Sequence, residues 1–151
     1  MAVRGYRRDA ALATAGLLMA GLLVCAGASR SPKGSVHRSP VDVAFSRDGS
    51  MLAVADQTAG EAVLVAPRTA QVVARFVAPG ASGVAFSADG RTLFVAARDA
   101  GALLSIDTRP RTVRRMISCA GPVQVALASR RGLVLVADAD LGQIVVARAA
   151  D

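Results

Sequence analysis

The sequence is poor in aromatic residues and histidine, and each shortage excludes a class of site. Aromatic residues make up 3% of the chain and tryptophan is absent, so the stacking platforms of single-strand nucleic-acid binders are missing. His37 is the only histidine, which leaves no Ser-His-Asp arrangement and no histidine metal cluster. The sequence also lacks a Cys-x-x-Cys-His haem attachment and a glycine-rich phosphate loop. We therefore assign no catalytic residue and expect no enzyme.

Cysteine and lysine are also scarce, with two cysteines and one lysine. Cys25 and Cys119 cannot form a disulfide framework, and we expect Cys119 to be a small, half-buried hydrophobic residue. The net charge of +7 comes almost entirely from arginine, because Lys33 is the only lysine. The arginines are scattered through expected turns and outer strands, so we expect a solvated basic surface and no nucleic-acid partner.

The first 28 residues have the pattern of an export signal. They begin with three arginines, continue without charge from Ala10 to Ala28, and end in the small residues Ala26-Gly27-Ala28 that signal peptidases accept. The alternative is an uncleaved anchor helix over residues 10–28, because the uncharged run approaches the roughly 20 residues that cross a bilayer. We expect an extracytoplasmic protein (periplasmic, cell-surface or secreted) or, alternatively, a membrane-anchored one.

Residues 29–40 are expected to be a linker. Serine, proline, glycine, lysine and arginine dominate this stretch, and no packed face can be drawn through it. A lone histidine in such a segment is most often exposed to solvent, so His37 is not proposed as a ligand.

One sequence motif recurs at a fixed interval. Residues 43–55 (VAFSRDGSMLAVA) are followed by residues 84–96 (VAFSADGRTLFVA) and, in degraded form, by residues 125–137, with an offset of 41 residues each time. A constant period in this range indicates a repeat architecture. The units are expected at 41–81, 82–122 and, incomplete, 123–151.

Each complete unit is predicted to contain four strands. The expected strands are Val41–Ser46, Met51–Asp56, Glu61–Ala66 and Gln71–Ala78; Gly83–Ser87, Thr92–Ala97, Ala102–Asp107 and Thr112–Ser118; and Pro122–Ala128, Leu133–Asp138 and Gln143–Arg148. The first two strands of each unit are almost continuously apolar, as in strands that are covered on both faces. Asp48-Gly49 and Asp89-Gly90 fall where a hairpin needs residues that accept positive φ.

Four short strands in about 40 residues are typical of a β-propeller blade. The sequence of these units resembles the YVTN-type β-propeller repeats. The resemblance rests on the Ser-x-Asp-Gly turns at residues 46–49 and 87–90 and on the strand motifs Phe94-Val95-Ala96, Leu103-Leu104-Ser105-Ile106-Asp107 and residues 72–76 leading to Gly80. Arg130-Arg131 replaces Asp-Gly in the third unit. The resemblance implies an all-β partial propeller of four-stranded antiparallel blades, about 2.7 of them, preceded by an N-terminal signal or anchor helix.

The number of units matters because closed propellers typically have 4 to 8 blades. With two complete blades and part of a third, the first and last sheets would expose Val- and Leu-rich faces, which soluble monomers avoid. We therefore expect a fragment or remnant of a larger propeller, whose exposed faces need self-association or further blades.

In propellers, the turns around the channel mouth usually hold the ligand. The residues expected on that face are Asp42, Asp56, Glu61, Arg98, Asp99, Gln124, Asp138 and Asp140. Several carboxylates around one opening could hold Ca²⁺ through oxygen ligands. The alternative is that they are ordinary solvated turn residues, and no other cofactor is expected.

Two functions remain. The first is an exported β-propeller repeat protein that acts as a binding or scaffolding module for a protein or small ligand. The alternative, implied by the resemblance, is the N-terminal propeller part of an exported enzyme, c-type haem peroxidase-like or lactonase-like, whose catalytic residues are absent from this chain.

Overall fold

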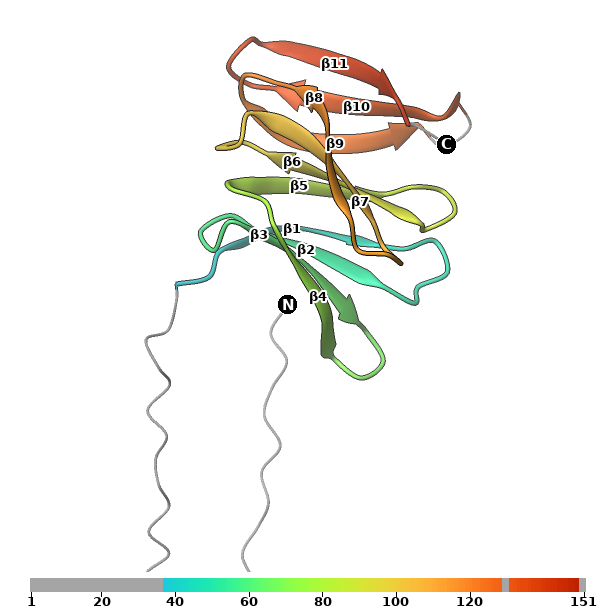
Figure 1. The fold of residues 1–151 in the computed structure, drawn as a ribbon. Helices are drawn as coiled ribbons and strands as arrows, with labels where there is room; N and C mark the ends of the chain where they lie inside the picture. The colour runs from blue at the N-terminus through green and yellow to red at the C-terminus, as the bar shows by residue number, and fades with distance from the viewer. Residues whose placement is uncertain (1–36, 129–130, 150–151) are drawn as a thin grey trace, which may run out of the picture. The chain divides into compact units, whose positions relative to one another are not determined.

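The computed structural model describes residues 37–128 and 131–149. The predicted export signal with its anchor alternative, Cys25 and most of the predicted linker lie outside these residues. The described residues form eleven strands in three antiparallel sheets, which follow one another along the chain (Figure 1). Within these residues, the expected all-β arrangement of two four-stranded antiparallel sheets and an incomplete third one is confirmed.

Each sheet is a simple meander in which neighbouring strands are also neighbours in sequence. The first sheet contains β1 (Pro40–Phe45), β2 (Leu52–Asp56), β3 (Glu61–Ala66) and β4 (Gln71–Val77). The middle sheet contains β5 (Ala81–Phe86), β6 (Thr92–Ala97), β7 (Ala102–Asp107) and β8 (Val113–Ser118). The third sheet contains β9 (Pro122–Ala128), β10 (Leu133–Asp138) and β11 (Gln143–Arg148).

All eleven predicted strands are present, with bounds that agree within two residues. The largest difference is at β5, which begins at Ala81 instead of Gly83, because a bulge lets the chain pair once more before the regular ladder begins. The same irregularity occurs near the start of β1 and β9. It skips Val41, Ser82 and Val123, which are 41 residues apart, so the bulge belongs to the repeat.

The last residues of the predicted linker pair with the first sheet or are bonded to it. Pro40 already pairs with Asp56 as the first residue of β1, and the side chain of Arg38 and the N–H of Ser39 are bonded to Asp56. His37 is exposed, as expected.

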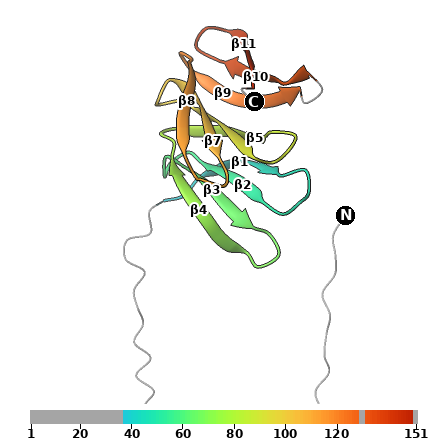
Figure 2. The same cartoon turned by 45° about the vertical axis from the view of Figure 1, so that its right-hand side comes forward.

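The sheets stack face to face, with the middle sheet between the other two (Figures 1 and 2). Successive strand residues point to opposite faces, so neighbouring side chains of β6 enter different cores. Leu93 packs in the core between the first and middle sheets, and Phe94 packs in the core between the middle and third sheets. Both are at most 1% exposed. Cys119 lies in the second core and is also buried.

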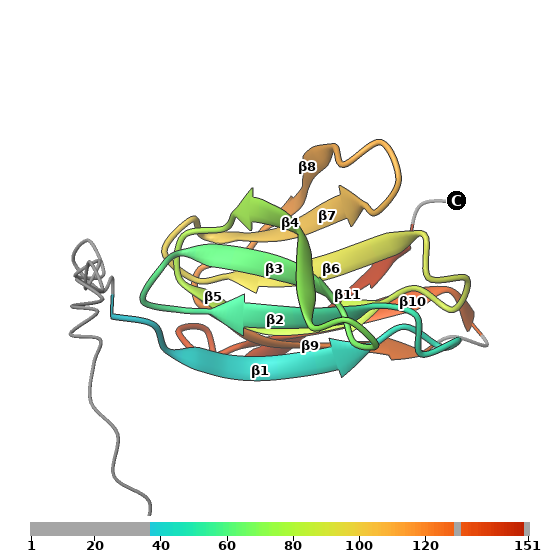
Figure 3. The same cartoon turned by 90° about the horizontal axis from the view of Figure 1, so that it is seen from below.

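The outer faces of the first and third sheets carry exposed apolar side chains in the described chain. Figure 3, seen from below, shows β1 to β4 side by side in the first sheet. Val43 and Phe45 of β1 are 58% and 61% exposed, and Ile144 and Val146 of β11 are 59% and 56% exposed. The prediction that the end sheets expose apolar faces is therefore confirmed. The described ranges contain no helix long and apolar enough to cross a membrane.

Candidate functional site

The turns between second and third strands lie beside the connections that lead from one sheet to the next. The N–H of Ala78 donates to the carbonyl of Gly60 at 2.8 Å, and the N–H of Cys119 donates to the carbonyl of Gly101 at 3.0 Å. We call this surface the turn face, and it comprises residues 38–42, 56–61, 78–83, 97–102, 119–124 and 138–143. All eight residues predicted for the channel mouth lie on it.

Asp56 is a structural staple at the end of β2. Its side chain is buried, and its carboxylate accepts hydrogen bonds from the N–H groups of Ser39 and Ala59 at 3.0 and 3.1 Å and from Arg38 at 3.2 Å. Burial raises the pKa of the carboxyl, but these hydrogen bonds outweigh it, and the pKa falls below its ordinary value. Asp56 thus ties the chain entering β1 to the β2–β3 turn.

Asp138 plays the same part in the third sheet. It is buried, and it accepts hydrogen bonds from the N–H groups of Ala120, Gly121 and Leu141 at 2.8, 3.0 and 3.1 Å. Burial again raises the pKa of the carboxyl, and the three N–H groups more than compensate, so the pKa is lowered. Ala97 occupies this position in the middle sheet, so the carboxylate staple occurs in the first and third sheets.

Glu61 lies between two arginines. Its carboxylate accepts hydrogen bonds from the guanidinium groups of Arg38 and Arg75. The hydrogen bond with Glu61 is the largest cause of the raised pKa of Arg38. The sequence interpretation missed both arginines, because Arg38 was placed in the linker and Arg75 in an outer strand. The alternation that puts Glu61, Val63 and Arg75 on one face was the available signal.

Arg98, Asp99 and Asp140 connect sheets at their turns. The guanidinium of Arg98 donates to Asp140 at 2.9 Å, which joins the β6–β7 turn to the β10–β11 turn. Asp99 lies so close to Gly80 that an added Cβ would be 2.6 Å from the Asp99 backbone nitrogen. Asp140 crowds Gly121 in the same way, with its Cγ 2.3 Å from the position of such a Cβ. The recurring glycines therefore admit the aspartates of a neighbouring sheet.

Asp42, Gly83 and Gln124 occupy one repeat position, just after the bulge in each first strand. Asp42 accepts hydrogen bonds from the N–H groups of Val43 and Val84, both at 2.9 Å. Gln124 instead accepts from its own neighbour Val125 at 3.2 Å. Its side-chain oxygen fills the space that a side chain at position 83 would need, 2.2 Å from the added Cβ.

The calcium hypothesis finds no support in the described part of the chain. There, no three side chains of aspartate, glutamate, histidine or cysteine gather closely enough to hold a metal ion. The carboxylates of Asp56, Glu61 and Asp138 are turned to N–H and guanidinium donors instead. The alternative, that these are ordinary solvated turn residues, does not hold for Asp56 and Asp138, whose side chains are buried and accept hydrogen bonds from backbone N–H groups.

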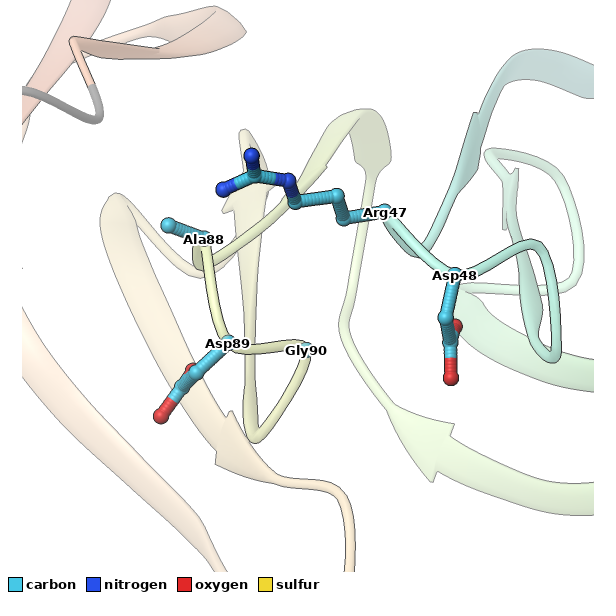
Figure 4. A pocket seen from close by; sticks show the side chains of 5 residues that line it. All are labelled: Arg47, Asp48, Ala88, Asp89 and Gly90. Carbon is cyan, nitrogen blue, oxygen red and sulfur yellow. The ribbon is translucent and has the colours of Figure 1, made fainter.

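The described surface has one hollow beside these residues and others at the opposite end of the sheets. A hollow of about 260 Å³ at the edge of the turn face is lined by Val123, Ala137, Asp138, Ala139, Gly142, Gln143 and Ile144. A second, of about 370 Å³, lies between the β1–β2 and β5–β6 turns and was not singled out from the sequence. Figure 4 shows Arg47 reaching from the first of these turns toward Ala88 of the second.

Two aspartates line the second hollow, and the carboxylate of each already accepts hydrogen bonds within its own turn. The carboxylate of Asp48 accepts from the hydroxyl of Ser46 at 2.6 Å, and Asp89 accepts from Ser87 at 2.6 Å. The hydrogen bond from Ser46, with further ones from Ser50, lowers the pKa of Asp48 to about 2. These carboxylates brace the predicted Asp-Gly hairpins, in which Gly49 and Gly90 do adopt positive φ.

The described structure resembles solved β-propeller proteins. It matches hydrazine synthase of Kuenenia stuttgartiensis with a TM-score of 0.61 at 18% identity, over 75% of this chain and 37% of that one. It matches Hsv2 of Kluyveromyces lactis with a TM-score of 0.55 at 16% identity, over 76% of this chain and 34% of that one. The chain thus spans about a third of the length of either protein.

No family model and no curated protein sequence matches the chain. The likeness to known structures is therefore one of fold, since the identities are low. The three antiparallel sheets and the similarity to two propeller proteins together show that the described residues form a β-propeller-like module.

Proposed function

We propose that the chain is an exported, non-catalytic propeller module of the YVTN type, which binds or scaffolds a protein or small ligand at its turn face. The 41-residue repeat and its Ser-x-Asp-Gly turns support the YVTN assignment, and the arginine-led apolar segment at residues 1–28 supports export.

The observation that carries the proposal is that turn-face side chains form hydrogen bonds that hold the turns in place. Asp56 and Asp138 bind backbone N–H groups, and Arg98 binds Asp140 across two sheets. Such contacts fix the positions of the turns and leave a preorganised surface. Preorganisation lowers the entropy cost of binding a partner, which suits a recognition surface built on rigid sheets.

The test is site-specific photo-crosslinking in cells that express the full chain. A photoreactive residue is placed at Thr58, which is exposed in the β2–β3 turn of the turn face. The matched control is Thr69, which is exposed in the β3–β4 turn at the opposite end of the same sheet. The proposal predicts a discrete adduct from position 58 and none from position 69. Equal adducts at both positions, or none at either, would contradict it.

Export is tested separately by fusing alkaline phosphatase, which folds to an active form only outside the cytoplasm, after Asp151. The full chain should give an active fusion. A matched fusion that begins at Ser29 should be inactive, because it lacks the proposed signal. Equal activity of the two fusions would count against export by this segment.

A further inference from the structure

The outer face of the first sheet is apolar across β1 and β2 and carries charge at β3 and β4, where Glu61 and Arg75 share the side of Val63. The strand register brings Phe45, Leu52 and Val65 into one row across β1, β2 and β3. It brings Val43, Val54 and Val63 into the next row on the same side. We call these six residues the first outer face. Val43 and Phe45 are its two exposed members, Leu52, Val54 and Val65 are partly exposed, and Val63 is only 6% exposed.

The middle sheet has the same surface, and there it is buried. The residues 41 positions later are Val84, Phe86, Leu93, Val95, Leu104 and Ile106. All six pack in the core between the first and middle sheets and are at most 8% exposed. Four positions are identical in the two sheets, and the other two exchange valine for leucine or isoleucine. The first outer face is therefore an intersheet surface that lacks its neighbour in the described chain.

The surface on which the middle sheet rests also has a counterpart. It consists of the inward-facing residues Ala44, Ala53, Ala55, Ala62 and Leu64 of the first sheet. The residues 82 positions later are Ala126, Leu135, Ala137, Ile144 and Val146, and the register places them on one face of the third sheet. We call these five residues the third outer face. Ile144 and Val146 are more than half exposed.

We infer that the first outer face of one chain docks on the third outer face of a second copy. The two faces differ, so the contact is head to tail, and two such contacts related by a two-fold axis would close a ring. Such a ring has six sheets, which lies within the range of known propellers. Burial of both apolar faces drives the association. This goes beyond the proposed function and depends on no turn-face residue.

The occupant is a second copy because the chain itself carries both halves of the contact. The first outer face keeps four of the six residues of a surface that the chain already buries between its own sheets. The third outer face keeps alanine at two of five positions and has Leu135, Ile144 and Val146 at the others, in the same register. A partner of other origin would have to reproduce that pattern. An identical copy already carries that pattern, and each copy would cover the other's exposed Phe45 and Ile144.

The first test is the mass of the purified full chain by size-exclusion chromatography with light scattering. The inference predicts twice the mass of one chain at micromolar concentration. The variants Phe45→Glu and Ile144→Arg should each be monomeric, since either change puts a charge into both contacts of the ring. The control Val113→Glu alters an exposed valine at the edge of the middle sheet, and it should remain dimeric.

Mixing the two monomeric variants distinguishes head-to-tail docking from every symmetric arrangement. The Phe45→Glu chain keeps an intact third outer face, and the Ile144→Arg chain keeps an intact first outer face. An equimolar mixture should therefore form a heterodimer through one wild-type contact. Circular dichroism of each variant checks that its strands are retained, which is expected because both substituted residues are exposed.

Several outcomes overturn the inference. A wild-type chain that stays monomeric at all concentrations does so, and so does a mixture of the two variants that forms no heterodimer. Loss of the dimer in Phe45→Glu but not in Ile144→Arg would show that two first outer faces meet instead. A longer natural chain whose additional blades cover both faces would equally exclude a second copy.

Discussion

The carboxylate of Asp42 in β1 accepts a hydrogen bond from the backbone N–H of Val84 in β5, at 2.9 Å. The first strands of two successive sheets are thus joined by a side chain. The middle and third sheets are joined differently, by the hydroxyl of Ser82, which donates to the carbonyl of Pro122 at 3.1 Å, and by the Arg98–Asp140 pair. The apolar cores set how the sheets stack, and these polar contacts add directional constraints.

Replacing Asp42 tests the first of these links. Asp42→Ala leaves the N–H of Val84 without its acceptor in a partly buried position, so the free energy of unfolding should fall by about 1–3 kcal/mol. Urea denaturation measures the change. Thr58→Ala, at an exposed turn residue, serves as a control and should stay within about 0.5 kcal/mol of the wild type. Equal stability of Asp42→Ala and wild type would show that the link contributes nothing.

The aspartate staples predict an acid-dependent stability. The pKa values of Asp56 and Asp138 are lowered in the folded chain, so the unfolded chain binds more protons at low pH. Their contribution is present above the unfolded pKa of about 4 and is lost as the pH falls through the lower folded values. Melting temperatures between pH 7 and pH 2.5 should therefore decline on acidification.

The double variant Asp56→Asn/Asp138→Asn separates these groups from the others. It should melt lower than the wild type at pH 7, and its melting temperature should depend less on pH below about 4. Part of the slope should remain, because the pKa values of Asp48 and Asp89 are lowered as well. An unchanged pH profile in the double variant would contradict the staple assignment.

Alanine substitutions at two glycines with the same backbone conformation distinguish the cost of a steric clash from the cost of backbone strain. Gly80 and Gly142 have φ of 65° and 62°, and an alanine at either should cost about 1 kcal/mol for the left-handed conformation. Only at Gly80 would the added Cβ meet a backbone atom, the nitrogen of Asp99 at 2.6 Å. Gly80→Ala should therefore lose about 1–3 kcal/mol more than Gly142→Ala in chemical denaturation. An equal decrease in the free energy of unfolding in both variants would mean that Asp99 moves aside without destabilising the fold.

The neighbouring β6 residues Leu93 and Phe94 should stabilise different intersheet cores. Leu93→Ala opens a cavity between the first and middle sheets, and Phe94→Ala opens one between the middle and third sheets. Each should cost about 2–5 kcal/mol. Because stacked repeats interact mainly with their neighbours, limited trypsin digestion should attack the first sheet faster in Leu93→Ala and the third sheet faster in Phe94→Ala. The same cleavage pattern in both variants would contradict separate cores.

The repeat made most of the fold predictable. The repeated motif around Phe45 and Phe86 predicts two strands joined by a turn. The 41-residue offset extends this prediction to the degraded third unit. The bulge that moves the start of β5 to Ala81 recurs in all three sheets but was not predictable in this way, because the skipped residues Val41, Ser82 and Val123 share no residue type that marks a bulge.

The candidate site was less predictable than the fold. Position in the repeat was enough to place Asp56 and Asp138 on the turn face, but not to show that they are buried staples. Their partners are backbone N–H groups of Ala59 and Gly121, and backbone groups carry no sequence signal. The separate roles of Asp42, Gly83 and Gln124 were also hidden, because one repeat position holds three different residues.

The central claim is that each sheet depends on its neighbours, and that the middle sheet alone among the three is covered on both faces. Native-state hydrogen exchange tests this most directly, at a concentration where light scattering finds single chains. The account predicts the slowest exchange in β5, β6 and β7 and clearly faster exchange in β1 and β11. Exchange in β1 and β11 as slow as in β6, in a monomer, would contradict it.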